Sequence, residues 1–361
     1  MTETPATATG PVRVSPADLR TFCAALLQRG GGLSPAHART TADVFVWAAQ
    51  RGIDSHGTAR VPAYLELLAK GVANAGAAMA LESAAPATAV LDADRAPGPV
   101  ALTTAADEAV RRARANGTAA VAVRGTVHTG AVGYYAARIA EQGLIGLVFV
   151  AGMPQMAYTG AKGAAVATSP LAVAVPAPAS SGRPPLLLDM ATATIALGRI
   201  RQAKAAGTPL PDGAAATADG TPTTDPELAV MPLPLGGAKG SGMSLAFEML
   251  TSVLVGAPIL PGFHSGDPQG RKHRQNALLI ALDPAAFGGA DAFAEAVDAT
   301  LGTVKGLPPA DGVQDVSYPG ERSAAVGEER AAKGIPVAPK VWRDLLEAAA
   351  RADVPPPPSR P

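Results

Sequence analysis

Side chains that could act on a carboxylic acid are gathered in one short stretch, RGIDSHGTARVPAY, at residues 51–64. Ser55 and His56 place a hydroxyl beside an imidazole, and Arg60 and Tyr64 follow with a guanidinium and a phenol. An imidazole can donate a proton, a guanidinium can hold a carboxylate through two parallel hydrogen bonds, and a phenol can orient a substrate. These residue types together predict a site for a 2-oxo acid.

A second histidine, His128, lies in the sequence GTVHTGAVG, between a predicted strand and a predicted helix. The chain has five histidines, and none has the spacing of metal ligands, so we expect no metal in the site. His264 and His273 belong to the polar sequence GFHSGDPQGRKHRQN, where we expect both to be solvated. A lone histidine is more often structural than catalytic, but His56 and His128 both lie at element ends. Both roles therefore stay open for each.

Two predicted helices position the stretch that carries His56. Ser34 and Pro35 offer a capping hydroxyl and a proline at the first helical position, and Gly52 ends that helix, because glycine tolerates the left-handed conformation. The sequence VPAYLELLAK predicts the second helix. Arg60 would then share a helix face with the tyrosine four residues later, whereas the Ser-His pair would lie in the loop between the helices. This arrangement predicts the edge of a pocket.

Beyond residue 75, apolar runs alternate with helical patterns. TAAVAVR predicts a strand, AVGYYAARIAEQ a helix closed by Gly143, and LIGLVFVA a buried strand, which together form a βαβ unit. Ligands of such units bind outside the carboxyl ends of the strands, which is where His128 falls. Further strands are expected at PLAVAVPA, PLLLDMA and ALLIALD, with helices between them. The fold class is therefore α/β with a mixed β-sheet.

The chain divides into four predicted segments. Residues 12–75 form an N-terminal helical segment, and residues 76–303 form the mixed α/β domain. Residues 304–352 are loop-rich, then close with a helix that packs back on the helical segment. The sequence VPPPPSRP ends the chain, and we expect residues 353–361 to be a disordered tail.

Composition argues against several classes of partner. Lysine plus arginine and aspartate plus glutamate both total 30, and no basic run occurs, so nucleic-acid binding is not expected. A single cysteine, Cys23, forbids an intrachain disulfide and fits a reducing compartment. The N-terminus lacks the pattern of a signal peptide, and no apolar run could span a bilayer. We therefore expect a cytoplasmic protein without a membrane partner.

The usual nucleotide-binding fingerprints are missing. No G-x-G-x-x-G follows a strand, and no P-loop occurs. The sequence LGGAKGSGMSLAFEML does place Lys239 in a glycine-rich turn before a helix, a geometry that can bring backbone N–H groups and a cation to a phosphate. A tight turn without a ligand would explain the same pattern. A standard Rossmann site is therefore not expected.

The stretch GIDSHGTARVPAYLELLAKG resembles the opening signature of the malate/L-lactate dehydrogenase family, which includes ureidoglycolate dehydrogenase, diketogulonate reductase, sulfolactate dehydrogenase and the cyclic ketimine (piperideine-2-carboxylate) reductases. The likeness continues in order through HTGAVGYYAARIAEQGLIG, ATSPLAVAVP, LLLDMATATIALGRI, GTPTTDP, LPLGGAKGSGMSLAFEML and YPGERSAAVGEERAAKGIPV. The resemblance implies an oxidoreductase that uses NAD(H) or NADP(H). It also implies a nicotinamide-binding domain that is not Rossmann-like, a helical domain formed by the N- and C-terminal segments, and a homodimer with active sites between its subunits.

The resemblance also assigns roles to individual residues. Ser55 and His56 would be the relay and the proton donor, Arg60 the ligand of the substrate carboxylate, and Thr168 a further substrate contact. In some members the histidine that matches His128 is assigned the proton transfer instead, so both alternatives stay open. The implied cofactor contacts are His128, Thr129, Gly130, Ala131, Val132, Asp189, Met190, Ala191, Thr192, Lys239, Pro319, Gly320, Glu321 and Arg322.

Some positions depart from the family pattern. Ala-Thr-Ser-Pro stands at 167–170 where Gly-Thr-Asn-Pro is common, and Ser241 stands where tyrosine is frequent. These departures predict an altered substrate choice. The expected reaction is hydride transfer between the nicotinamide and C2 of a small 2-oxo or 2-hydroxy acid. One alternative is reduction of a cyclic or N-alkyl imine carboxylate, and another is a non-catalytic binding protein on the same fold. Arg183 or Arg322 could meet a 2′-phosphate.

Overall fold

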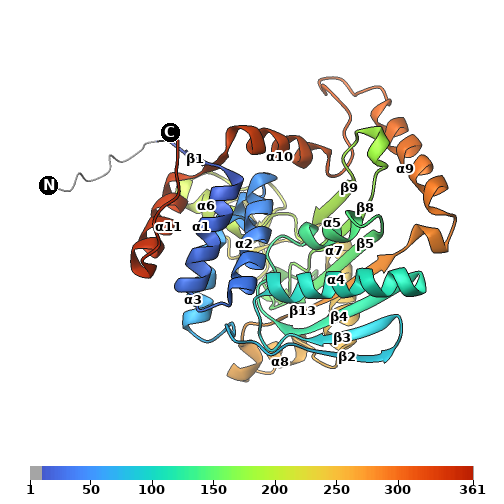
Figure 1. Cartoon of the computed structure of the whole chain (residues 1–361). Helices are drawn as coiled ribbons and strands as arrows, with labels where there is room; N and C mark the ends of the chain where they lie inside the picture. Colours follow the sequence, from blue (N-terminus) through green and yellow to red (C-terminus); the bar gives the residue numbers. More distant parts are fainter. Residues whose placement is uncertain (1–9, 361) are drawn as a thin grey trace.

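A seven-stranded mixed sheet organises the fold, with strand order β2-β3-β4-β13-β5-β8-β9 (Figure 1). The computed structural model describes residues 10–360. β3 and β4 are parallel, and every other neighbouring pair in the sheet is antiparallel. The strands are β2 (Ala80–Ala85), β3 (Thr88–Asp92), β4 (Thr118–Thr126), β5 (Ile145–Gly152), β8 (Leu171–Val175), β9 (Leu186–Met190) and β13 (Gln275–Leu282).

Two layers of helix cover this sheet. α4 (Gly98–Asn116) and α5 (Gly133–Ala140) pack on one face through an alanine-rich core. α7 (Ala238–Glu248) and the π-helical turn Met249–Val253 that follows it pack on the other face. Aromatic residues make up only 4% of the chain, so small side chains fill the core and let helices approach the sheet closely.

The two ends of the chain share a second core. Four helices build it together with a two-stranded sheet, in which β1 (Val12–Val14) pairs antiparallel with β14 (Ile335–Val337). Figure 1 shows these helices grouped to one side of the seven-stranded sheet. They are α1 (Pro16–Arg29), α2 (Pro35–Gln50), α3 (Val61–Ala69) and α11 (Pro339–Ala352). Ser34 caps α2 by accepting from the backbone N–H of His37.

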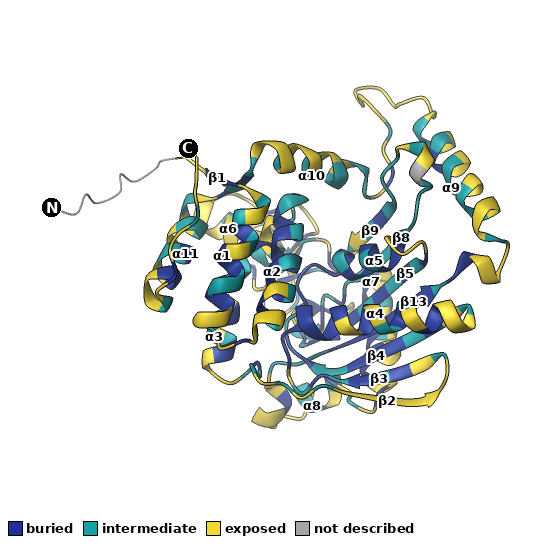
Figure 2. Cartoon of the chain, viewed as in Figure 1, coloured by how far each residue is buried: buried dark blue, intermediate teal, exposed yellow. Residues whose placement is uncertain are grey.

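Smaller elements complete the fold. β6 and β7 form a hairpin, and β10, β11 and β12 form a three-stranded sheet. The strands are β6 (Met156–Ala157), β7 (Ala164–Val166), β10 (Ala215–Ala216), β11 (Pro222–Thr223) and β12 (Met231–Pro232). The helices are α6 (Leu197–Ala206), α8 (Leu260–His264), α9 (Ala290–Lys305) and α10 (Glu321–Lys333). In Figure 2, many residues along α9 and α10 are coloured as exposed, while the centre of the sheet is coloured as buried.

Three expectations from the sequence differ from the structure. The region after residue 304 was expected to be loop-rich, but it contains α10, whose Ala, Glu and Arg residues favour a helix although only Gly327 is buried. The proline-rich tail, expected to be disordered, returns to β1, where Arg360 and Arg13 exchange two backbone hydrogen bonds of 2.8 and 2.9 Å. β4 and β5 do run parallel, but β13 lies between them, so the predicted βαβ unit spans an intervening strand. Among residues 10–360, no helix has both the length and the apolarity needed to cross a membrane.

Candidate active site

The Ser-His pair lies in a single 3₁₀ turn, Asp54–His56, between α2 and α3. Arg330 of α10 holds this turn, since it forms an ion pair of 2.6 Å with Asp54 and donates to the carbonyl of Ala49. Figure 1 shows α10 running from the sheet near β9 to the helical group. The turn is therefore fixed by a helix from the far end of the chain.

Within this turn, the side chains are ordered by short hydrogen bonds. The Oγ of Ser55 lies 2.9 Å from the Nδ1 of His56, and the Nε of Arg60 donates to the carbonyl of Ser55 at 2.7 Å. The rest of the Arg60 guanidinium has no acidic partner among the described residues, and burial lowers its pKa. A desolvated guanidinium without a carboxylate is a suitable place for an anionic ligand to bind.

His128 lies directly beside this turn, in the loop after β4. The rings of His56 and His128 are stacked with centroids 5.7 Å apart. The phenol of Tyr64, which is 1% exposed, lies 2.9 Å from the Nδ1 of His128 and also donates to the carbonyl of His128. Because the N–H of Gly130 donates to the same Nδ1, that nitrogen is an acceptor, and the neutral ring carries its proton on Nε2.

Both histidines are neutral at pH 7. Burial and, to a smaller extent, the charge of Arg60 together lower the pKa of His56 to about 4. The pKa of His128 falls well below its usual value, first because of burial and then because of the charges of Arg60, His56 and His273. Two neutral imidazoles thus lie beside the cation Arg60, whose own pKa is lowered by burial and by the charge of Arg201, and such perturbed groups are typical of a functional site.

Close backbone packing places the His128 loop. The N–H of Gly98 donates to the carbonyl of His128 at 3.2 Å, and a Cβ on Gly98 would overlap that carbonyl and lie 2.5 Å from the Cα of Thr129. β4 also contains an extra residue relative to β13, at Gly125, whose φ is +71°. The N–H of Gly125 is taken by the Oδ1 of Asn276 at 2.8 Å. Such a bulge turns the end of a strand, and here it aims the loop toward the Ser-His turn.

The predicted cofactor segments meet along β9, the edge strand of the sheet. Asp189 accepts from the N–H of Gly133, the first residue of α5, at 2.9 Å. The Asp189 side chain stays accessible to solvent, yet the protein around it raises its pKa to about 6, because desolvation outweighs this hydrogen bond. This bond joins β9 to the segment that follows His128, and Thr129, Ala131 and Val132 there are buried.

The glycine-rich turn is attached further along the same strand. Both the N–H and the hydroxyl of Thr192 donate to the carbonyl of Thr168, at 2.9 and 2.8 Å. The carbonyl of Thr192 accepts from Leu235 at 2.8 Å, and a Cβ on Gly240 would lie 2.6 Å from that same carbonyl. The start of α7, with the exposed side chain of Lys239, therefore lies beside the end of β9.

The last predicted segment attaches at the start of β9. The N–H of Leu187 donates to the carbonyl of Pro319 at 2.9 Å, which fixes the Pro-Gly-Glu-Arg turn before α10. Glu321 is paired with Lys305 at 3.1 Å, whereas Arg322 is exposed. Arg183 forms an ion pair of 2.9 Å with Asp298. A 2′-phosphate would therefore meet an unpaired Arg322 more readily than the paired Arg183.

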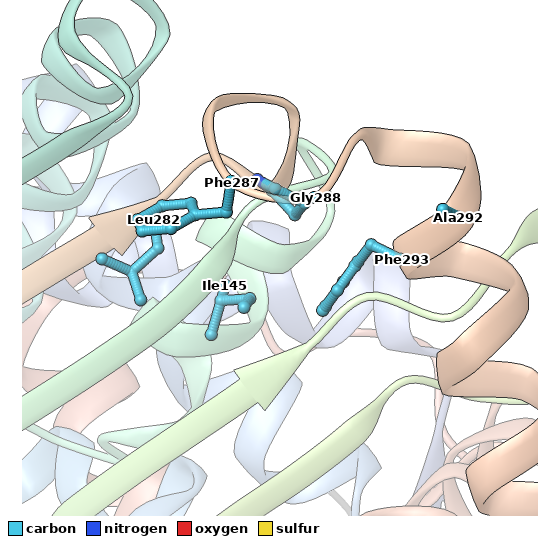
Figure 3. A pocket seen from close by; sticks show the side chains of 7 residues that line it. Ile145, Leu282, Phe287, Gly288, Ala292 and Phe293 are labelled. Atoms are coloured by element: carbon cyan, nitrogen blue, oxygen red, sulfur yellow. The ribbon is translucent and has the colours of Figure 1, made fainter.

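Two hollows lie outside the histidine cluster. One of about 560 Å³ borders the Lys239 turn and is lined by residues 157–162, 219–222 and Gly237. The other, of about 400 Å³, is apolar and lies where β5 begins and β13 ends (Figure 3). His128 lies beyond the opposite ends of these central strands. The side chains of the apolar hollow, which include Phe287 and Phe293, offer no group for proton transfer, so it is not the candidate active site.

His273 is less exposed than its polar sequence predicts. It was expected to be solvated, but it is half-buried, its Nε2 is inaccessible, and its charge acts on His128. Its position follows from the pairing of β13 with both β4 and β5, for which the local sequence offers no signal. His264 is exposed, as expected, and lies 2.9 Å from the carbonyl of Ala165.

Comparison with known proteins decides the family. Residues 14–346 match the model of the malate/L-lactate dehydrogenases. The chain belongs to this family. It is therefore an oxidoreductase of the dehydrogenase type, and the resemblance inferred from the sequence is confirmed.

The similar proteins differ in substrate and in cofactor. This malate/L-lactate dehydrogenase family member is 32% identical to the ureidoglycolate dehydrogenase (NAD(+)) of Escherichia coli (strain K12) over 325 residues, which cover 88% of this chain and 90% of the relative. It is 33% identical to the (2R)-3-sulfolactate dehydrogenase (NADP(+)) of Chromohalobacter salexigens over 298 residues, 81% of this chain and 85% of the relative. The solved structure of a delta1-piperideine-2-carboxylate reductase from Pseudomonas syringae pvar. tomato matches with a TM-score of 0.82 and 30% identity, covering 93% of this chain and 99% of that one. The relatives therefore include both cofactors, and both hydroxy-acid dehydrogenases and an imine reductase.

Proposed function

We propose that this protein transfers a hydride between a nicotinamide cofactor and C2 of a small 2-oxo or 2-hydroxy acid. The observation that carries this proposal is the half-buried Arg60, which has no acidic partner among the described residues and lies beside two neutral histidines. A substrate carboxylate would supply the missing partner through two parallel hydrogen bonds. It would then hold C2 near both imidazole rings.

His56 is the proton donor in this proposal. Its Nδ1 faces the hydroxyl of Ser55, which can accept a hydrogen bond and so stabilise an imidazolium ion. The Nδ1 of His128 instead receives the N–H of Gly130, which favours the neutral ring. His128 can therefore donate its Nε2 hydrogen to the substrate oxygen and orient it, while His56 gives up the proton.

Substrate binding prepares His56 for this step. The charge of Arg60 lowers the pKa of His56 in the free protein. A bound carboxylate offsets that charge, so the pKa of His56 rises when the substrate arrives. The reduced nicotinamide, when bound, supplies the hydride to C2. His56 then protonates the carbonyl oxygen, leaving a 2-hydroxy acid and a neutral imidazole, and the reverse reaction uses the neutral imidazole as base.

The segments along β9 would hold the cofactor. Lys239 is an exposed cation at the start of a helix, which suits a phosphate group, and the Asp189 carboxyl can accept from a ribose hydroxyl. Thr192 donates to the carbonyl of Thr168 and accepts from the N–H of Leu235, just before the Lys239 turn. The donor set therefore fits a dinucleotide without a G-x-G-x-x-G turn.

We also propose a homodimer with active sites near the subunit contact. Met249, Leu250, Val253 and Leu254 follow α7 and expose 43–62% of their surfaces. They continue the helical segment that begins with Lys239, so a partner seated there would contact the same helix whose first turn faces the cofactor segments. Light scattering on wild type and Leu254→Glu tests this contact, with Leu307→Glu as a matched exposed control. A monomeric wild-type protein would contradict it.

The first test is a titration with NADH and NADPH followed by nicotinamide fluorescence, then turnover of a panel of 2-oxo acids. Saturable binding of one cofactor, with turnover that Arg60→Met reduces and the exposed control Arg39→Met leaves unchanged, supports the proposal. Failure of both cofactors to bind would refute it.

A cyclic imine carboxylate is the second candidate substrate. The structural likeness to a piperideine-2-carboxylate reductase favours it, and the same proton donor and carboxylate ligand would serve. Comparing turnover of oxaloacetate with that of piperideine-2-carboxylate distinguishes the two substrates.

A further inference from the structure

The start of β13 lies between the two loops that follow β4 and β5. Gln275, the first residue of β13, is paired with Thr126 at the end of β4 and with Gly152 at the end of β5. His273 precedes Gln275 by two residues, and His128 follows Thr126 by two, so extending the antiparallel register of this pair places the two histidines opposite each other. The charge of His273 acts on His128, which agrees with this placement.

His273 and Gln275 lie on the side of the sheet that carries the site. Alternate residues of a strand share a face, so Gln275 lies on the face of Ala277 and Leu279, which belong to the core with α4 and α5. The His128 loop leads into α5 on that same side. Arg274 points to the other side, where its guanidinium lies beside Gly262 of α8.

Both side chains have buried polar atoms without partners. The Nε2 of His273 and the Oε1 of Gln275 are inaccessible and form no hydrogen bond within residues 10–360. Buried polar groups are nearly always paired, so unpaired ones at the edge of a site need a partner, which a bound ligand can supply. Burial lowers the pKa of His273, which favours its neutral form.

We propose that His273 and Gln275 contact the substrate and recognise a neutral group on C3 that both donates and accepts hydrogen bonds, such as an amide or a hydroxyl. This inference rests on the proposed function, because Arg60 would hold the carboxylate at the other end of the same substrate. A neutral imidazole and a neutral amide offer no charge to a second anion, whose burial would be unfavourable. An amide can accept from His273 and donate to Gln275.

Three 2-oxo acids that differ only in the terminal group test this. They are 2-oxobutyrate with a methyl group, oxaloacetate with a carboxylate, and 2-oxosuccinamate with an amide. We expect the wild-type kcat/KM for the amide to exceed those for the other two acids about 10-fold or more. His273→Leu should lower kcat/KM for the amide about 10- to 100-fold and change kcat/KM for 2-oxobutyrate less than about 3-fold. His273→Gln should restore part of the loss, and His264→Leu is the exposed control.

Preference of the wild type for oxaloacetate or 2-oxobutyrate would overturn the inference, as would an equal loss for all three acids in His273→Leu. If the wild type reduces none of them, the proposed function fails first, and binding then tests the contact separately. Calorimetry with succinamate, succinate and butyrate, which lack the C2 oxygen, serves this purpose. Selective weakening of succinamate by His273→Leu supports the contact, and unchanged succinamate binding overturns it.

Discussion

Tyr64→Phe separates the stability of the His128 loop from the orientation of its imidazole. The Tyr64 hydroxyl is buried, donates to the carbonyl of His128, and lies 2.9 Å from its Nδ1. Tyr135 provides a matched control, because it is 0% exposed and its hydroxyl donates at 2.5 Å to the carbonyl of Thr129, the residue that follows His128. Only the first of these phenols touches the ring.

Both substitutions remove a hydrogen bond to a carbonyl, and the carbonyl of His128 keeps the N–H of Gly98 as a donor. Each lost bond costs about 0.5–1.5 kcal/mol in free energy of unfolding. We therefore expect Tyr64→Phe and Tyr135→Phe to lose similar stability in urea unfolding. The kinetic effects should differ, since an imidazole that moves by about 1 Å can reduce a rate as much as about 100-fold. Tyr64→Phe should lower kcat/KM for a 2-oxo acid at least about 10-fold, and Tyr135→Phe less than about 3-fold.

The assay pairs urea unfolding with initial rates at saturating cofactor. Equal losses of kcat/KM in the two variants would show that general loosening of the loop, and not the phenol beside the ring, limits catalysis. Unchanged kcat/KM in Tyr64→Phe would refute the orienting role of the phenol.

Three further perturbations follow from the site. Oxidation of a 2-hydroxy acid needs the neutral form of His56, whose pKa is lowered to about 4. We therefore expect kcat/KM to stay level from about pH 8 to about pH 5 and to fall about tenfold per pH unit below about pH 4, as the single imidazole is protonated. An inflection near pH 6.5 would contradict this. Arg60→Met should raise KM for a 2-oxo acid about 10- to 100-fold, because a charged hydrogen bond contributes about 1.5–3 kcal/mol, and a KM within about twofold of wild type would argue against carboxylate binding there. Gly98→Ala should cost about 1–3 kcal/mol in urea unfolding and lower kcat, because its Cβ would overlap the His128 loop, whereas Gly288→Ala, whose Cβ has open space, should not.

Local patterns were enough to predict the helices and the turn around His56. Ser34 and Gly52 mark the ends of α2 through capping and left-handed geometry, which depend on neighbouring residues alone. The loop position of His128 followed from a short apolar strand and a helical period, which are also local. These features were predictable because each depends on a few consecutive residues.

Features that depend on distant pairing were not predictable in the same way. The insertion of β13 between β4 and β5 is decided by which apolar strand best fills the centre of the sheet, and the periodicity of each strand is the same wherever it pairs. The position of His273 follows from that insertion, so its polar sequence suggested a solvated loop instead. The contact of Arg330 with Asp54 likewise joins residues 276 apart.

The attachment of every predicted cofactor segment to β9 has a consequence for local opening. β9 is an edge strand with a single strand neighbour, so its amide hydrogens should exchange with solvent at a lower free-energy cost than those of β13 at the centre. A ligand that binds only the closed strand would shift this opening equilibrium by mass action. Slower amide exchange confined to β9 and its attached turns would therefore report cofactor binding before any substrate is identified.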